Sequence, residues 1–205
     1  METTKIVIDG LVALGTLLVA ATAIWGDWFR AKFVPTKLTL TGPIPAGGAR
    51  TTYSTGAKAM FVQFKVINES QLSARNCRVM LVGMSRRDPS GNFQPEPMIY
   101  PCPFTWSPME AMPPIMTIVR EQQLDLGYVN ENGPAFVPRF YYQPFNFRGT
   151  ILPNEAVRYE IQIEAENFTS PRYVVEVAWD GQWSFVPDEM RRHLPIRFVN
   201  RGISG

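Results

Sequence analysis

The chain has 205 residues, 45% of them hydrophobic, and its 20 Lys and Arg against 18 Asp and Glu leave a formal net charge of +2. This near balance provides no broad basic surface, so we expect no nucleic-acid partner. Two cysteines, Cys77 and Cys102, are too few for a disulfide framework, and the sequence leaves open whether they pair.

The first predicted element is a transmembrane helix over residues 6–25, IVIDGLVALGTLLVAATAIW. Twenty residues at about 1.5 Å rise span roughly 30 Å, the thickness of a bilayer's hydrocarbon core. Aromatic and basic residues at the end of this run are typical of the lipid–water boundary, and the predicted membrane-interface residues are Trp25, Trp28, Phe29, Arg30 and Lys32. Because proline ends a helix, Pro35 limits the helix and its juxtamembrane turn to residues 1–35.

A cleaved signal peptide remains an alternative, because Ala21-Thr22-Ala23 resembles a small-x-small cleavage site. The weakly basic start and the aromatic and basic flank favour a retained anchor instead. A buried globular helix is disfavoured, since the run is apolar around its whole circumference. Basic residues after the helix outnumber Lys5 before it. This imbalance favours single-pass insertion into the plasma (inner) membrane with the C-terminal domain in the cytoplasm.

One stripe of the helix carries small and polar residues at alternating spacings of three and four: Asp9, Ala13, Thr16, Ala20 and Ala23. Small residues let membrane helices approach closely, so the stripe suggests self-association into a homo-oligomer with Asp9 turned inward. The alternative is that Asp9 lies within one turn of the headgroups and reaches water.

Residues 36–205 are expected to form one β-rich domain of the size that can bury its own core. The clearest strands, Arg158–Glu166 and Arg172–Asp180, alternate apolar and polar residues and are separated by a short turn, which predicts a hairpin. Further strands are predicted over 37–41, 58–67, 76–84, 117–128 and 194–199. A short helix is predicted over 187–192, because Pro187 suits a helix start and the charges there suit the helix dipole.

Short strands with Gly and Pro turns, and no long helical period after the anchor, predict a mainly β domain. We expect an immunoglobulin-like β-sandwich preceded by a single N-terminal transmembrane α-helix. The Cys-Trp-Cys arrangement of true immunoglobulins is absent, so the likeness concerns architecture alone.

Two segments do not follow the strand pattern: the proline- and methionine-rich residues 93–116 and the aromatic-rich residues 134–148. Exposed Met and aromatic side chains often contribute to protein–protein interfaces. We therefore predict a possible partner surface that consists of Trp106, Met109, Met112, Tyr141 and Tyr142. The competing interpretation is that both segments fold over a sheet and complete the core.

We find no catalytic motif and expect no enzymatic activity, no cofactor and no metal. The lone histidine, His193, is expected at the surface or at a helix end, and one histidine with two distant cysteines gives no zinc spacing. Asn68-Glu69-Ser70 matches a glycosylation acceptor, a triplet that is frequent by chance.

Three segments, IWGDWFR at 24–30, SARNCRV at 73–79 and VAWDGQW at 177–183, resemble a group of uncharacterised bacterial proteins. Those proteins combine one N-terminal membrane helix with a β-sandwich, and the resemblance implies no activity or site residues. We therefore expect a membrane-anchored module that mediates protein–protein interaction at the bacterial inner membrane. The alternatives are an oligomeric membrane effector or channel-like protein in stress or phage defence, and an exported ligand-binding domain.

Overall fold

A computed structural model describes residues 2–33, 35–44, 50–52, 56–98, 100–108 and 112–201, and in the first helix it describes the side chains of residues 10–26. The first part of the chain forms α1 (Glu2–Phe33), β1 (Leu38–Thr41), β2 (Arg50–Thr52), β3 (Lys58–Asn68), β4 (Ala74–Arg87), β5 (Phe93–Glu96), β6 (Cys102–Pro103) and β7 (Thr105–Trp106). The second part forms β8 (Met116–Ile118), β9 (Glu121–Asn130), β10 (Gly133–Pro138), β11 (Glu155–Ala165), β12 (Phe168–Thr169), β13 (Tyr173–Trp179), α2 (Pro187–His193) and β14 (Ile196–Arg201).

The fold is mainly β, and the described strands form two sheets, which is consistent with a β-sandwich. The first sheet has the order β1-β3-β9-β10, with β2 on β3 and β7 on β9. The second has the order β14-β13-β11-β4-β5, with β12 on β11 and both β6 and β8 on β4. The named strand pairs are antiparallel, as expected for sheets that place one face on a core and the other in water.

The core lies between the two sheets and is built from alternate residues of their strands. On β11, Tyr159, Ile161 and Ile163 are buried, and on β13 the residues at odd positions from Tyr173 to Trp179 are buried. The predicted hairpin is confirmed, because β11 and β13 pair in antiparallel register from Glu155 opposite Trp179 to Ile161 opposite Tyr173. The predicted short helix is confirmed as α2.

The two lateral sides of the body differ. On one side the chain crosses between the sheets, because β6 pairs with β4 of the second sheet and β7 pairs with β9 of the first. On the other side the edge strands β1 and β14 face each other without such a crossing among the described residues. Phe64 of β3 and Phe198 of β14 pack edge to face there, with ring centroids 5.5 Å apart. We call this open side the seam.

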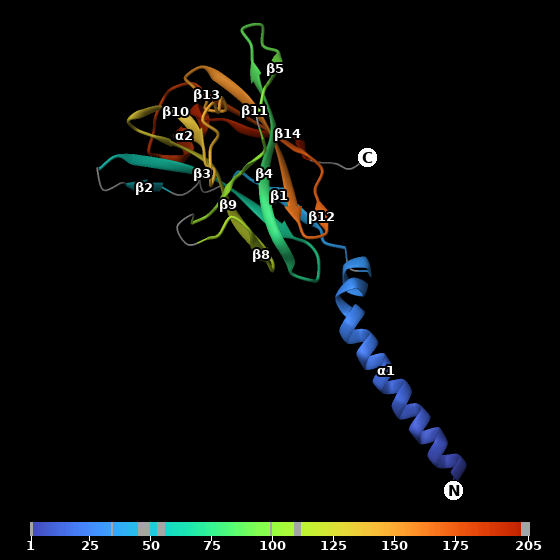
Figure 1. The fold of residues 1–205 in the computed structure, drawn as a ribbon. Helices are drawn as coiled ribbons and strands as arrows, with labels where there is room; N and C mark the ends of the chain where they lie inside the picture. The colour runs from blue at the N-terminus through green and yellow to red at the C-terminus, as the bar shows by residue number, and fades with distance from the viewer. Residues whose placement is uncertain are drawn as a thin grey trace.

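Helix α1 lies apart from both sheets. Figure 1 shows it joining the body where β1 begins and extending away from it. Over residues 10–26 no side chain is buried, and exposure reaches 72% at Ile24. Within the described residues, no helix is long and apolar enough to cross a bilayer.

Candidate functional site

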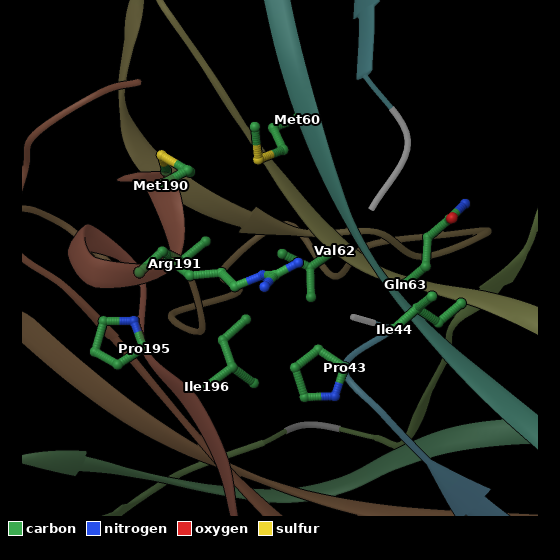
Figure 2. A pocket seen from close by; sticks show the side chains of 10 residues that line it. Pro43, Ile44, Met60, Val62, Gln63, Met190, Arg191, Pro195 and Ile196 are labelled. Atoms are coloured by element: carbon green, nitrogen blue, oxygen red, sulfur yellow. The ribbon is translucent and has the colours of Figure 1, made fainter. Parts of the chain in front are cut away.

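A hollow with a volume of about 350 Å³ lies on the seam (Figure 2). Its walls come from the turn after β1, from β3, from α2 and from the start of β14. The lining residues are Pro43, Ile44, Met60, Val62, Gln63, Met190, Arg191, Leu194, Pro195 and Ile196. The volume lies at the small end of the range for ligand pockets, and the walls are mainly apolar, as such pockets usually are. We call it the seam pocket.

The local sequence explains why the sheets leave this space open. Strand β1 ends at Thr41, and the backbone amide of Ile44 then donates to the Gln63 carbonyl at 2.9 Å, which holds the following turn against β3. From the other sheet, α2 buries Met190 into the core, and its cap residue Leu194 is buried as well. A short helix therefore stands where a continuous edge strand would have closed the space.

The seam pocket has one charged residue among those that line it, Arg191. Figure 2 shows the Arg191 side chain reaching across the pocket toward Val62. Its guanidinium forms an ion pair with Asp188 one turn earlier at 3.1 Å, and the Asp188 side chain is 85% exposed, so this pair is weak. A second hollow shares Pro195 with the seam pocket, and its charged and titratable lining residues are Arg87, Glu155, Asp180, Arg192 and His193.

His193 is half-buried at the end of α2 and is paired with Asp180, its Nδ1 lying 2.8 Å from Oδ2. Partial burial raises the pKa of Asp180, but hydrogen bonds from His193 and from the Gln182 amide outweigh it and hold the pKa below its ordinary value. Among the described residues no hydroxyl or thiol hydrogen-bonds to His193, so the pair lacks a nucleophile to activate. The pair joins α2 to the end of β13, in agreement with the expected helix-end position.

The structure divides the predicted partner surface. Trp106 is 0% exposed, so its place in a partner surface is wrong. Met112 and Tyr141 are partly buried and pack against the core, and their place in a partner surface stays a prediction. The physical reason for this burial is the crossing between the sheets, which turns the proline-rich segment inward. The Trp106 indole donates to the Pro114 carbonyl at 3.3 Å, and the Tyr141 hydroxyl donates to the Pro113 carbonyl at 3.0 Å. Met109 lies outside the described residues.

Tyr142 remains at the surface with 50% exposure, and two aromatic residues missed by the prediction accompany it. The Tyr100 and Tyr142 rings have centroids 5.9 Å apart, and Phe145 is fully exposed. Tyr100 belongs to the proline- and methionine-rich segment and Phe145 to the aromatic-rich one, and the sequence offers no signal that separates inward from outward side chains in either segment. That separation depends on pairings with β4 and β9.

A buried polar cluster on the outer side of the first sheet was also missed. Gln63 donates to Asp125 at 2.9 Å and to Ser107 at 2.7 Å, and Arg139 donates to Asp125 at 3.3 Å. The Arg139 guanidinium also lies 4.8 Å from the centre of the Phe61 ring. These contacts hold the inter-sheet crossing against β3 and β9, so we assign the cluster to structure. The polar residues at alternate positions of β3 and β9 are the signal that could have indicated it.

The predicted membrane residues are only partly described. Trp25 is exposed, while the side chains of Asp9, Trp28, Phe29, Arg30 and Lys32 lie outside the description. Ala13, Thr16, Ala20 and Ala23 are all exposed, which a single chain would show with or without self-association, so the homo-oligomer stays a prediction.

Both cysteines are free and buried in the core. Burial raises the pKa of the Cys77 thiol to about 11, and burial also raises the pKa of Cys102. Neither thiol is therefore set up as a nucleophile. Among the described residues no group of His, Cys, Asp and Glu is arranged to hold a metal ion.

No protein-family model matches the chain, and no curated protein or solved structure matches it. Proposals about function therefore rest on the geometry and on the residues themselves.

Proposed function

We propose that the protein is a membrane-anchored module that binds a protein partner at the bacterial inner membrane. The observation that carries this proposal is the outward exposure of the apolar side chains of α1 around its whole circumference. The largest of them are Leu11, Val12, Leu14, Leu17, Leu18, Val19, Ile24 and Trp25, each more than half exposed.

An apolar helix of this kind is unfavourable in water. Each Å² of apolar surface that remains exposed forgoes roughly 25 cal/mol of burial free energy. A soluble helix usually confines its apolar residues to one face that packs on a core, and an all-round apolar helix is typical of a membrane or a deep interior. The body does not bury the described side chains of α1, so lipid is the solvent that we propose for them.

The two threonines whose side chains are described in α1 donate their hydroxyl hydrogens within the helix. The Thr16 hydroxyl donates to the Val12 carbonyl at 2.9 Å, and the Thr22 hydroxyl donates to the Leu18 carbonyl four residues earlier at 2.5 Å. In hydrocarbon every hydrogen-bonding group must find a partner within the protein. The described span therefore presents its threonines to the surroundings as apolar surface, which suits residence in a bilayer.

We further propose that the chain crosses the bilayer once with its body in the cytoplasm, since Arg30, Lys32 and Lys37 follow the span. The finer fold assignment, an immunoglobulin-like sandwich, belongs to the same proposal. The two sheets and the alternating core support it. The tether confines the body to a thin layer beside the membrane and so raises its effective concentration toward partners held there.

For the partner site we propose the seam pocket. Its mainly apolar walls suit an apolar side chain, and Met60 and Met190 can adjust to the shape of the guest. Arg191 at the rim, with Arg87 and Arg192 beside it, suits an acidic flank on the partner. The proposed occupant is therefore a segment of a membrane-bound protein that carries an apolar anchor beside acidic residues.

Site-specific photo-crosslinking of the intact chain in bacterial membranes tests this function. A photoreactive side chain at Ile44 lies in the wall of the seam pocket, and one at Ser90, in the exposed β4–β5 turn, is the matched control. We expect a discrete cross-linked product from position 44 that Arg191→Glu removes, and no such product from position 90. Equal products from both positions, or a position-44 product that survives Arg191→Glu, would contradict the proposed site.

A further inference from the structure

The end of the body nearest α1 carries two exposed apolar side chains on neighbouring loops. Leu72, between β3 and β4, is 41% exposed, and Val119, between β8 and β9, is 66% exposed. Arg75 and Arg120 accompany them and are also exposed. We call these four residues the anchor-side patch.

One buried amide holds the two loops together. The Asn68 Nδ2 group donates to the carbonyls of Leu72, Ile118 and Val119 at 2.8, 3.0 and 3.2 Å. The Asn68 Oδ1 atom accepts from the Ser70 backbone amide at 3.0 Å and from the Ser70 hydroxyl. Asn68 is only 8% exposed, so this amide is engaged in structure and is not available as a glycosylation acceptor.

The patch lies on the same end of the body as the junction with α1. Leu38, the first residue of β1, pairs with Asn68, and the Glu69 amide donates to the Lys37 carbonyl at 2.9 Å. Asn68 in turn donates its backbone amide to the Arg120 carbonyl at 2.7 Å. Figure 1 shows α1 leaving from the end of the body where β8 and the β3–β4 connection lie. A bilayer that holds α1 therefore lies on the side to which this end of the body is turned.

The charged side chains at this end of the body favour binding to an anionic surface. Glu69 is paired with Lys37 at 2.6 Å, and Glu121 is paired with Lys65 at 2.8 Å. Within the described part of the chain, Arg75 and Arg120 form no ion pair. Among the described carboxylates at this end, Glu166 is the one without an ion-pair partner. Juxtamembrane basic residues are attracted to the anionic headgroups of the cytoplasmic leaflet.

We propose that the anchor-side patch docks on the bilayer that holds α1, with Leu72 and Val119 entering the interface and Arg75 and Arg120 binding anionic headgroups. This inference rests on the proposed membrane anchoring. Docking fixes the orientation of the body relative to the membrane, so that the seam pocket meets membrane-bound partners from a defined direction. Side chains that insert in this manner reach about 5–10 Å into the headgroup region.

Spin labels on the intact chain in vesicles measure this docking. Leu72→Cys places a label in the patch, and Ser90→Cys places the control label at the opposite end of β4. The native cysteines are buried and do not compete for the label in the folded protein. Accessibility to oxygen, which concentrates in lipid, is compared with accessibility to a water-soluble nickel reagent, in phosphatidylcholine vesicles with and without phosphatidylglycerol.

With phosphatidylglycerol present, the label at position 72 should favour oxygen and the label at position 90 should favour nickel. Omitting the anionic lipid, or introducing Arg120→Glu, should shift the position-72 label toward water. The docked-to-free ratio should fall about fivefold for each basic charge removed, the factor expected for one basic residue near an anionic surface.

Co-flotation of the chain with the vesicles separates the two proposals. If the chain floats but the label at position 72 is as accessible to nickel as the label at position 90, the docking is wrong and the anchor stands. A chain that does not float overturns both. A position-72 label shielded from both reagents indicates protein contact instead of lipid, which also overturns the proposal.

Discussion

Helix α1 and the body use the same apolar residue types in opposite ways. In the body Trp106, Phe64 and Tyr159 are 0% exposed between the sheets, whereas in α1 Leu17 and Val19 are 67% and 69% exposed. The body completes its own core through pairings between distant strands. The helix contributes nothing described to that core. The comparison indicates that the apolar residues of the two regions are suited to different solvents. A substitution that disrupts one region should therefore leave the other intact.

The largest expected effect comes from placing charge in the helix. Leu14→Arg with Leu17→Arg should cost about 6 kcal/mol of insertion free energy, because an arginine at the centre of a membrane helix is strongly disfavoured. The intact variant should no longer float with vesicles, while thermal unfolding of the body is unchanged. Leu14→Ile with Leu17→Ile is the matched control and should float like the wild type. A drop in the melting temperature of the body would show that α1 packs on it.

The reverse experiment breaks the body and leaves the helix. Trp106→Ala removes a completely buried indole from the inter-sheet crossing and should lower the free energy of unfolding by about 4 kcal/mol. Denaturant unfolding measures the loss, and flotation should be unaffected. Phe145→Ala, at a fully exposed position, is the control and should change stability by less than about 0.5 kcal/mol. Equal effects from the two variants would contradict the assignment of Trp106 to the core.

A smaller decrease in the free energy of unfolding is expected when the buried polar cluster is disrupted. Asp125→Ala leaves the amide of Gln63 and the guanidinium of Arg139 without their shared acceptor, which should cost about 2 kcal/mol. Urea unfolding of Asp125→Ala beside the exposed-site variant Asp188→Ala measures the difference. A neutral Asp125→Ala would show that the crossing is held by its apolar contacts alone.

The last effect is absent at neutral pH and appears only in alkaline solution. The folded-state pKa of Cys77, about 11, lies above its ordinary value of 9.0, so folding favours the neutral thiol. This contribution to stability is complete below pH 9 and is lost as the pH rises toward 11, by about 1.4 kcal/mol for each pH unit. The free energy of unfolding of Cys77→Ala should lack this part of the decline with pH. Denaturant unfolding of the wild type and of Cys77→Ala between pH 9 and pH 11 measures the difference. Parallel curves would contradict a buried, protonated Cys77.

Local patterns predicted the elements whose partners are near in the sequence. The alternation from Arg158 to Glu166 and from Arg172 to Asp180 gave β11 and β13 to within a few residues, and Pro187 marked the start of α2. Residues 117–128, predicted as one strand, form β8 and β9 with a turn at Val119 and Arg120 between them. No Gly or Pro marks that turn, and the β-branched Val119 within it is typical of a strand.

The inter-sheet crossing could not be predicted in the same way. Its two strands are each two residues long and have no period. The pairing of β6 with β4 and of β7 with β9 therefore depends on contacts from distant parts of the chain. The seam pocket was missed for the same reason, because its walls come from β3 and α2, which lie far apart in the sequence. The anchor-side patch likewise depends on Asn68, which binds the carbonyls of Leu72, Ile118 and Val119 only in the folded chain.

Hydrogen–deuterium exchange of the intact wild-type chain in phospholipid vesicles tests the central claim most directly. An isolated helix without tertiary contacts exchanges quickly in water, whereas amides in hydrocarbon are protected because water does not reach them. The account predicts that the amides of residues 10–25 stay protected even when urea unfolds the body. Exchange of those amides at the rate of the exposed β4–β5 turn would contradict it.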